Sequence, residues 1–411
     1  MHSSFMLKNL LFIIALFGFF GLASAQNKPN YIGQDPLNTV TTAVPFLMIA
    51  PDARAGAMGD AGVSSTPDAF SQHWNPAKYA FIDSDMGFSL SYSPWMRKLV
   101  SDINLAYVTG YKKLDDKSAI AASLLYFSLG DIVFTEITGQ TIGNYRPNEF
   151  ALDFSYSRKL SETLSGAITA RYIHSNLTQG QDVGGQTTKP GNSIAADVSI
   201  YSQHKVTVFN TDALFSWGVN ISNIGSKISY TDDNTRKDFI PTNLRIGPSL
   251  AFNLDQYNSL TFMADFNKLL VPTPPIYKIN ATTNQPEVGV DGKYIIDKGM
   301  NPDVSVTAGI LQSFYDAPGG MKEEIREVTL SLGAEYWYNK QFAVRAGYFY
   351  EHPTKGNRKY YTMGAGLKYT KFKLDLSYLI PTEQHNPLEN TLRFSMILDF
   401  DALVQPSDER K

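Results

Sequence analysis

The chain has 411 residues, of which 43% are hydrophobic, 13% aromatic and only 18% charged. The charged fraction lies below the roughly 25% of an average soluble domain, so apolar surface must face something other than water. A formal net charge of −3 supplies no basic field for nucleic acid, and the absence of cysteine excludes disulfide scaffolds and thiolate metal sites. The composition therefore argues against an ordinary cytosolic enzyme and against a nucleic-acid partner.

Residues 1–25 have the organisation of a secretory signal peptide. Lys8 precedes an apolar run over residues 10–22, and small residues at 23–25 form a cleavage site. A membrane anchor is the alternative, but the run is shorter than the about 20 residues that a helical span needs. We expect the mature chain to begin near Gln26 and to be soluble in the periplasm, secreted, or folded as an outer-membrane β-barrel.

Residues 26–85 precede the first predicted strand and are rich in Gly and Ala. The segment is too long and too apolar for a disordered tail. The residues that follow it predict a β-barrel, as argued below, and we expect the segment to form a plug in the mouth of that barrel. Asn75, Pro76 and Ala77 are the plug residues that we single out. The glycines at 56, 59 and 62 lack the preceding strand and the Gly-Lys-Ser/Thr of a phosphate-binding loop, which favours tight packing instead.

A period of two in hydrophobicity runs along the rest of the chain. In residues 392–400, Leu392 and Phe394 share one face of a strand, whereas Arg393 and Ser395 share the other. The same alternation predicts further strands at 86–94, 102–112, 118–129, 150–157, 163–175, 193–203, 213–222, 242–254, 259–267, 328–335, 342–348, 359–369 and 372–378.

A soluble sandwich would show the same alternation, but three features favour a membrane barrel. Aromatic residues gather at strand ends, where lipid headgroups would lie. Short turns alternate with long polar loops, which predicts periplasmic turns and extracellular loops. The polar faces carry charges of both signs, which suit a wet lumen better than a dry core. These charged residues are Asp153, Arg171, Asp197, Arg245, Asp265, Glu335, Arg345 and Asp375.

A simple count gives fifteen strands if residues 302–314 are included. The strand at 259–267 runs outward and that at 328–335 runs inward, so only one outer connection joins them. We therefore assign residues 302–314, with a possible short helix, to a long outer excursion over 268–323. The prediction is an all-β, fourteen-stranded antiparallel barrel over 86–400, followed by a periplasmic tail at 401–411.

The outer excursion begins with large apolar residues and three prolines, where a solvated loop would be polar. Prolines lower the ordering cost of a binding segment, so we predict that this stretch contacts a partner protein. The alternative, a lid over the lumen or an extension of the wall, stays open. The predicted partner-binding residues are Leu269, Leu270, Val271, Ile276 and Tyr277.

No chemistry-bearing constellation emerges from the sequence. The six histidines show no metal-ligand spacing, and no nucleophile elbow occurs. The pairs Asp115-Asp116 and Asp232-Asp233 suit turns and loops better than calcium sites. We predict no catalytic residue, no metal and no cofactor.

Several segments resemble a known family. DARAGAMGDAGV (52–63) and WNPA (74–77), with fourteen strands, resemble FadL-type outer-membrane proteins. SFYDAPGG (313–320), GAEYWYN (333–339) and RAGYF (345–349) are similar to the PorV family, also called LptO, of the Bacteroidetes type IX secretion system. The likeness covers essentially the whole mature chain, and the last three segments are its more specific part.

The resemblance implies an outer-membrane accessory of protein export, in contact with lipid and with its loops outside the cell. PorV-like proteins are similar to shuttles that bind the C-terminal domains of secreted cargo beside a large SprA- or Sov-like translocon barrel. They pass the cargo to an attachment complex containing PorU, PorZ and PorQ. The main alternative is a FadL-type transporter of hydrophobic small molecules; a general porin and a lipid-modifying enzyme are weaker ones.

Overall fold

The structure is a computed structural model that describes residues 37–98, 100, 102–135, 138–183, 186–231, 237–383 and 386–400. The predicted signal peptide at 1–25 and the predicted tail at 401–411 lie outside the described residues. All helices and strands given below belong to the unit Asn38–Lys411.

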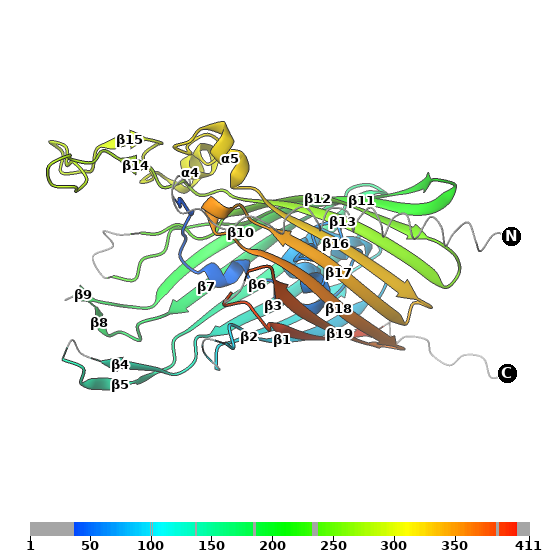
Figure 1. The fold of residues 1–411 in the computed structure, drawn as a ribbon. Coiled ribbons are helices and arrows are strands. Elements are labelled where there is room, and N and C mark those ends of the chain that lie inside the picture. The colour runs from blue at the N-terminus through cyan, green and yellow to red at the C-terminus, as the bar shows by residue number, and fades with distance from the viewer. Residues whose placement is uncertain are drawn as a thin grey trace, which may run out of the picture. The chain divides into compact units, whose positions relative to one another are not determined.

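Fourteen antiparallel strands close into a barrel in which β20 pairs with β1 (Figure 1). The strands, in their order around the barrel, are β1 (Met86–Pro94), β2 (Asn104–Lys113), β3 (Ser118–Ser128), β6 (Asn148–Lys159), β7 (Leu164–Asn176), β10 (Gly191–Val208), β11 (Thr211–Gly225), β12 (Asn243–Asn253), β13 (Asn258–Leu269), β16 (Thr329–Tyr338), β17 (Phe342–Tyr350), β18 (Lys359–Tyr369), β19 (Phe372–Pro381) and β20 (Leu392–Phe400). The predicted fold class and strand count are confirmed.

The strands are inside out relative to those of a water-soluble protein. On β1, Phe88 and Leu90 are 43% and 41% exposed, whereas Ser89 and Ser91 between them are buried. On this strand the apolar residues therefore point outward and the serines point into the lumen, which is the pattern of a barrel whose outer wall contacts lipid hydrocarbon.

The two ends of the barrel differ in their connections. Turns at one end are tight: three residues join β16 to β17, and two of them, Asn339 and Lys340, have the positive φ of the central residues of a type I′ turn. The other end, which we call the long-loop end, carries the small strand pairs, two α-helices and one short 3-10 helix (Figure 1). These elements are β4 (Ile132–Thr135) with β5 (Thr141–Tyr145), β8 (Asp182–Val183) with β9 (Gln186–Thr187), β14 (Ile276–Tyr277) with β15 (Ile296–Lys298), α4 (Val306–Gln312), α5 (Met321–Arg326) and η3 (Pro353–Lys355).

Helix α4 lies within the stretch 302–314, so the prediction that this stretch does not cross the membrane is correct. Its first turn is capped by Ser305, whose hydroxyl accepts a hydrogen bond from the backbone N–H of Ala308. The excursion differs at both edges from the predicted 268–323. Strand β13 continues through Leu269 and β16 begins at Thr329, so the connection, here called the long loop, spans residues 270–328.

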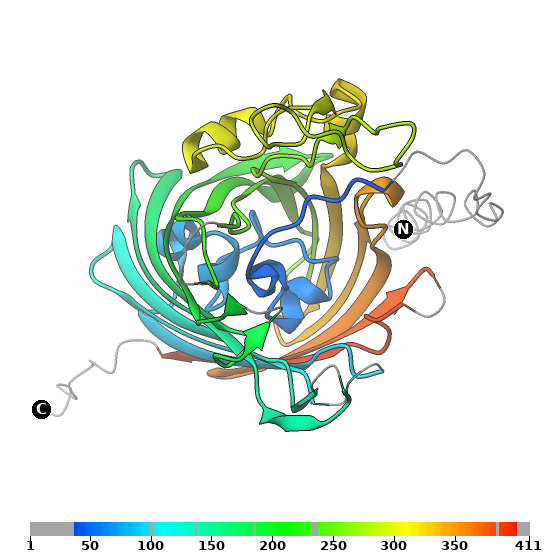
Figure 2. The same cartoon turned by 90° about the vertical axis from the view of Figure 1, so that its left-hand side faces the viewer.

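Residues 38–85 are here called the inner segment; they start at the long-loop end, where the N–H of Asn38 donates to the carbonyl of Thr354, and then enter the ring of strands (Figure 2). They form η1 (Pro45–Met48), α2 (Ala53–Gly56), α3 (Ser71–Trp74) and η2 (Pro76–Phe81). The main apolar core joins this segment to the wall: Phe46 and Phe70 are 1% and 0% exposed, and Phe70 stacks on Tyr107 of β2.

Candidate functional site: the inner segment and the long-loop end

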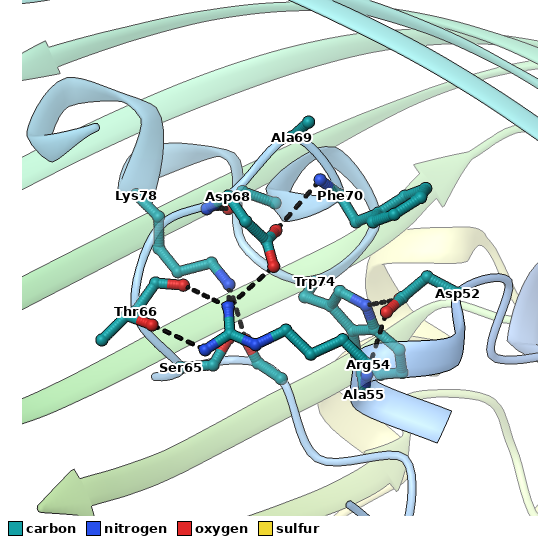
Figure 3. A network of polar contacts seen from close by, with 12 residues as sticks. Asp52, Arg54, Ala55, Ser65, Thr66, Asp68, Ala69, Phe70, Trp74 and Lys78 are labelled. Carbon is teal, nitrogen blue, oxygen red and sulfur yellow. Dashed lines mark hydrogen bonds and ion pairs between the residues drawn. The ribbon is translucent and has the colours of Figure 1, made fainter. Parts of the chain in front are cut away.

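Within the inner segment, Asp52 caps the start of helix α2 (Figure 3). The Asp52 carboxylate accepts hydrogen bonds from the backbone N–H of Ala55 at 2.9 Å and from Trp74 Nε1 at 2.6 Å. Burial, with a smaller contribution from the Asp68 carboxylate, raises the pKa of Asp52 to about 6. The side chain thus ties α2 to α3 inside the barrel.

Arg54 connects the inner segment to the barrel wall. Its Nη1 donates to Asp68 Oδ2 at 2.7 Å, within the segment (Figure 3), and its Nη2 donates to Glu335 Oε1 of β16 at 2.8 Å. The wall continues the network, because Arg345 of β17 donates to Glu335 at 2.6 Å and to Asp375 of β19 at 2.7 Å. Charges of opposite sign therefore alternate from the segment to side chains of β16, β17 and β19, which offsets the cost of burying them.

Asp265 of β13, the strand that pairs with β16, also holds the segment. Its Oδ2 accepts hydrogen bonds from the backbone N–H groups of Gly62 and Val63, at 2.7 and 2.9 Å. Gly62 has no room for a side chain, because a Cβ there would overlap the Trp74 ring. The glycine-rich stretch is therefore closely packed and bonded to the wall, which agrees with the prediction that its glycines serve tight packing.

Two of the three residues singled out for the plug, Asn75 and Ala77, form hydrogen bonds with the wall. The Asn75 side chain donates to the carbonyl of Ile200 on β10 at 2.9 Å and accepts a hydrogen bond from the N–H of Ala77 at 3.1 Å. Pro76 opens η2, and the carbonyl of Ala77 accepts a hydrogen bond from the Ser165 hydroxyl of β7 at 2.7 Å. All three are buried.

Backbone packs directly on backbone where the segment meets β17. A Cβ on Gly347 would overlap the backbone of Met58 and Gly59, and Gly59 itself adopts a φ of +69°. The N–H of Gly59 donates to the Thr362 hydroxyl of β18 at 2.8 Å. Glycine is required at position 347 because the segment approaches the wall too closely for any side chain.

Lys78 lies fully buried within the segment. Its Nζ donates to the carbonyl of Gly62 at 2.8 Å and to the Ser65 hydroxyl at 2.9 Å. Burial lowers the pKa of Lys78 to about 8, although the nearby carboxylate of Asp68 acts in the other direction. His73 is also affected, since burial and the positive charges of Arg245 and Arg171 lower its pKa well below the usual range.

The long loop begins with a buried base. Leu270 and Val271 are each 2% exposed, and the N–H of Leu270 donates to the carbonyl of Thr242 at 2.7 Å. The N–H of Thr273 donates to Asp316 Oδ2 at 3.1 Å, which joins the start of the loop to the turn between α4 and α5. The predicted partner residues Leu270 and Val271 are therefore part of the interior, and Leu269 belongs to β13.

Helix α5 is clamped onto the barrel by two lysines. Lys268 of β13 donates to Glu324 at 2.9 Å and to Glu327 at 2.6 Å. Lys355 of η3 donates to Glu323 at 2.5 Å and to Glu327 at 2.9 Å. Burial opposes ionisation of Glu323, but hydrogen bonds led by that from Lys355 lower its pKa overall.

Residues 276–298, here called the arm, extend from this base. Its two ends are joined by the pairing of β14 with β15, and Lys278 N donates to the carbonyl of Ile295 at 2.9 Å. The arm exposes apolar side chains: Val288 is 57% exposed and Val290 at its far end is fully exposed. The predicted residues Ile276 and Tyr277 lie at its root, where Ile276 is 41% exposed and Tyr277 is half-buried.

Sequence reasoning missed the residues that hold these parts in place. Arg54 lies within residues 52–63, which carry the family resemblance, but the residues next to it in the sequence do not indicate that it pairs with Glu335 of β16. Lys268 precedes the long loop and Glu327 lies near its end, and the sequence around α5 offers only the acidic pair Glu323-Glu324 as a sign of a helix.

Within the described ranges, no group of three or more His, Cys, Asp or Glu side chains is arranged to hold a metal ion.

No helix in the described part of the chain is long and apolar enough to cross a membrane.

Comparison with known proteins places these features in a family. Residues 32–276, more than half of the 411-residue chain, match the family described as type IX secretion system protein PorV. A search of curated proteins found no match.

Solved structures of similar chains include the toluene transporter TbuX of Ralstonia pickettii, which is 11% identical with a TM-score of 0.45 over 85% of this chain and 98% of that chain. The toluene transporter TodX of Pseudomonas putida is 11% identical with a TM-score of 0.45, over 88% of this chain and 98% of that chain. A FadL homologue of Pseudomonas aeruginosa is 11% identical with a TM-score of 0.43, over 89% of this chain and 100% of that chain. With its closed barrel, its lipid-facing outer wall and this family match, the chain is an outer-membrane β-barrel that belongs to the PorV family of type IX secretion system proteins.

Proposed function

We propose that this protein serves type IX secretion by binding exported protein at its long-loop end, without conducting it through the lumen. The bound element is the C-terminal domain of the cargo, received beside a large SprA- or Sov-like translocon barrel. The protein then passes the cargo to the attachment complex containing PorU, PorZ and PorQ. In this proposal the long-loop end is extracellular and the protein performs no catalysis.

The inner segment supports binding over conduction. The segment is hydrogen-bonded to lumen-facing side chains of the wall, namely Glu335 of β16, Asp265 of β13 and Ser165 of β7. A folded cargo domain would have to displace all of these contacts to enter. We propose that the segment acts as a plug that stays in place while the loops of the long-loop end bind cargo. The same contacts count against a FadL-type route for hydrophobic molecules, because buried charges line it.

The main support for the proposal is the exposed apolar surface of the arm. Val288 and Val290 expose large apolar side chains on a segment that projects from a base fixed by hydrogen bonds and ion pairs. Exposed apolar residues on a rigidly rooted element are typical of protein-binding surfaces. Ile276 and Tyr277 at the root remain candidate contact residues.

The pairing at the root allows the arm to be removed cleanly. Because Lys278 and Ile295 are hydrogen-bonded neighbours, a two-glycine link can replace residues 279–294 without straining the base. We expect the variant to fold as a barrel but to lose most surface-attached cargo and the co-purification of the translocon barrel. The matched control replaces residues 136–140, between β4 and β5, with the same two-glycine link, because Thr135 and Thr141 already pair.

Point substitutions refine the test. V288D and V290D place charge on the exposed face of the arm, and V133D, at a residue of β4 that is 55% exposed, is their control. Normal cargo export and normal recovery of the translocon barrel in the arm variants would refute the proposed binding role. Accumulation of an apolar small molecule in the purified barrel, together with normal export, would favour the transport alternative.

A further inference from the structure

A groove with a volume of about 290 Å³ lies on the outside of the barrel, between the wall and the long loop. The wall contributes Leu244 and Ile246 of β12 and Phe266 of β13. The long loop contributes Phe314, Met321 and Ile325, among others. We call it the wall groove.

The lysine clamp explains why α5 forms one side of this groove. Lys268 pairs with Leu244 across β12 and β13, so it points outward from the wall, and its Nζ holds Glu324 and Glu327. The acidic side of α5 is thereby turned to the wall. Met321 and Ile325, one helical turn apart, are left 69% and 67% exposed.

The wall groove is continuous with the lipid-facing surface. Ile246 and Phe266 are paired, outward-pointing residues that are 45% and 43% exposed, as are the hydrocarbon-facing residues of the other strands. Figures 1 and 2 place the gold α5 at the long-loop end and outside the ring of strands. The groove is therefore open toward the lipid-facing side of the wall at the long-loop end, beside the ion pair of Lys268 with Glu324.

We propose that the wall groove binds an acyl chain of a membrane lipid in this leaflet. Its lining offers aliphatic and aromatic side chains, and its cation, Lys268, is already paired with two carboxylates. Water in such a groove would find too few hydrogen-bond partners, whereas a hydrocarbon chain has no hydrogen bonds to lose when it enters. The inference goes beyond the proposed secretion function and does not depend on it, because it needs only the barrel in its membrane.

The test uses a photoreactive phenylalanine analogue at position 314 in the full chain. Phe314 lines the groove and is 44% exposed. The matched control carries the analogue at Phe394, an outward-facing residue of β20 that is 49% exposed and lies outside this groove. Native membranes are irradiated before and after dilution into detergent, and adducts are identified by mass spectrometry.

We expect a lipid adduct at position 314 that survives detergent dilution, whereas the adduct at position 394 disappears as surrounding lipid exchanges. Adducts that decline in parallel at both positions, or a protein adduct in place of lipid at 314, would overturn the proposal. A V328W substitution, which fills the groove, should lower the retained adduct at 314 at least fivefold. An unchanged yield in a folded V328W barrel would equally count against it.

Discussion

Arg54 and Glu335 form a two-point ion pair although 281 positions separate them in the sequence. Arg54 Nε donates to Glu335 Oε2 at 3.0 Å, and Nη2 donates to Oε1 at 2.8 Å. Their side chains are only 5% and 2% exposed. Since one residue belongs to the inner segment and the other to β16, the pair fixes the segment to the barrel wall in one orientation.

Removing Arg54 should loosen this attachment. R54M leaves Asp68 without its closest cation, and we expect the free energy of unfolding to fall by about 3–5 kcal/mol. Urea unfolding of the barrel in lipid vesicles measures the change. R97M, at an exposed arginine, is the control. If the pair is coupled, R54M and E335Q combined should cost less than the sum of the two; additivity within about 0.5 kcal/mol would contradict the coupling.

A side chain at position 347 should expel the inner segment. In G347V the new side chain would overlap the backbone of Met58 and Gly59. Because the overlapping atoms belong to the backbone, the clash cannot be relieved by rotating a side chain. We expect the variant barrel to conduct ions in planar bilayers far above the level of the unsubstituted protein. The control is G110A, because a Cβ on that strand glycine meets nothing closer than 3.7 Å. Equal conductance in G347V, G110A and the unsubstituted protein would show that the segment tolerates the clash.

Lys78 should make stability depend on pH in the alkaline range. Its pKa is lowered to about 8 in the folded protein from the 10.5 of a freely solvated lysine, so the unfolded chain binds more protons between these values. Stability from this group must then rise as pH increases from about 8 to about 10.5. Relative to K78M, the unsubstituted protein should gain on the order of 3 kcal/mol across this window. Parallel pH profiles for the two proteins would rule out this role, and K205M, at an exposed lysine, serves as control.

Glu327 should control how firmly the long loop is held. Its carboxylate accepts hydrogen bonds from Lys268, Lys355 and Thr273, at 2.6, 2.9 and 2.7 Å. E327Q removes the charge that both lysines share, and each charged hydrogen bond lost is worth about 1.5–3 kcal/mol. We expect limited proteolysis to cut residues 270–328 faster in E327Q. The comparison is E287Q, which disrupts the exposed pair with Lys278, where the effect should be within about 1 kcal/mol. Identical cleavage rates in the two variants would argue against the clamp.

The sequence by itself determined the barrel. The alternation in residues 392–400 and in the other strands is a local pattern with a period of two, so it is readable without knowing the partners of any strand. The parity of outward and inward strands then excluded a crossing at 302–314, where α4 forms. The apolar, glycine-rich composition of residues 52–63 likewise indicated close packing, which the contacts of Gly62 bear out.

Only the tertiary structure decided which residues meet. Arg54 finds Glu335 because closure of the barrel brings β16 beside the inner segment, and no local pattern encodes that closure. Leu270 and Val271 resembled an exposed apolar stretch, yet they are buried because the long loop folds back on its own base. The hydrophobicity of a residue indicates that its side chain avoids water. Whether that side chain is covered by the fold, by lipid or by a partner protein depends on contacts between distant parts of the chain.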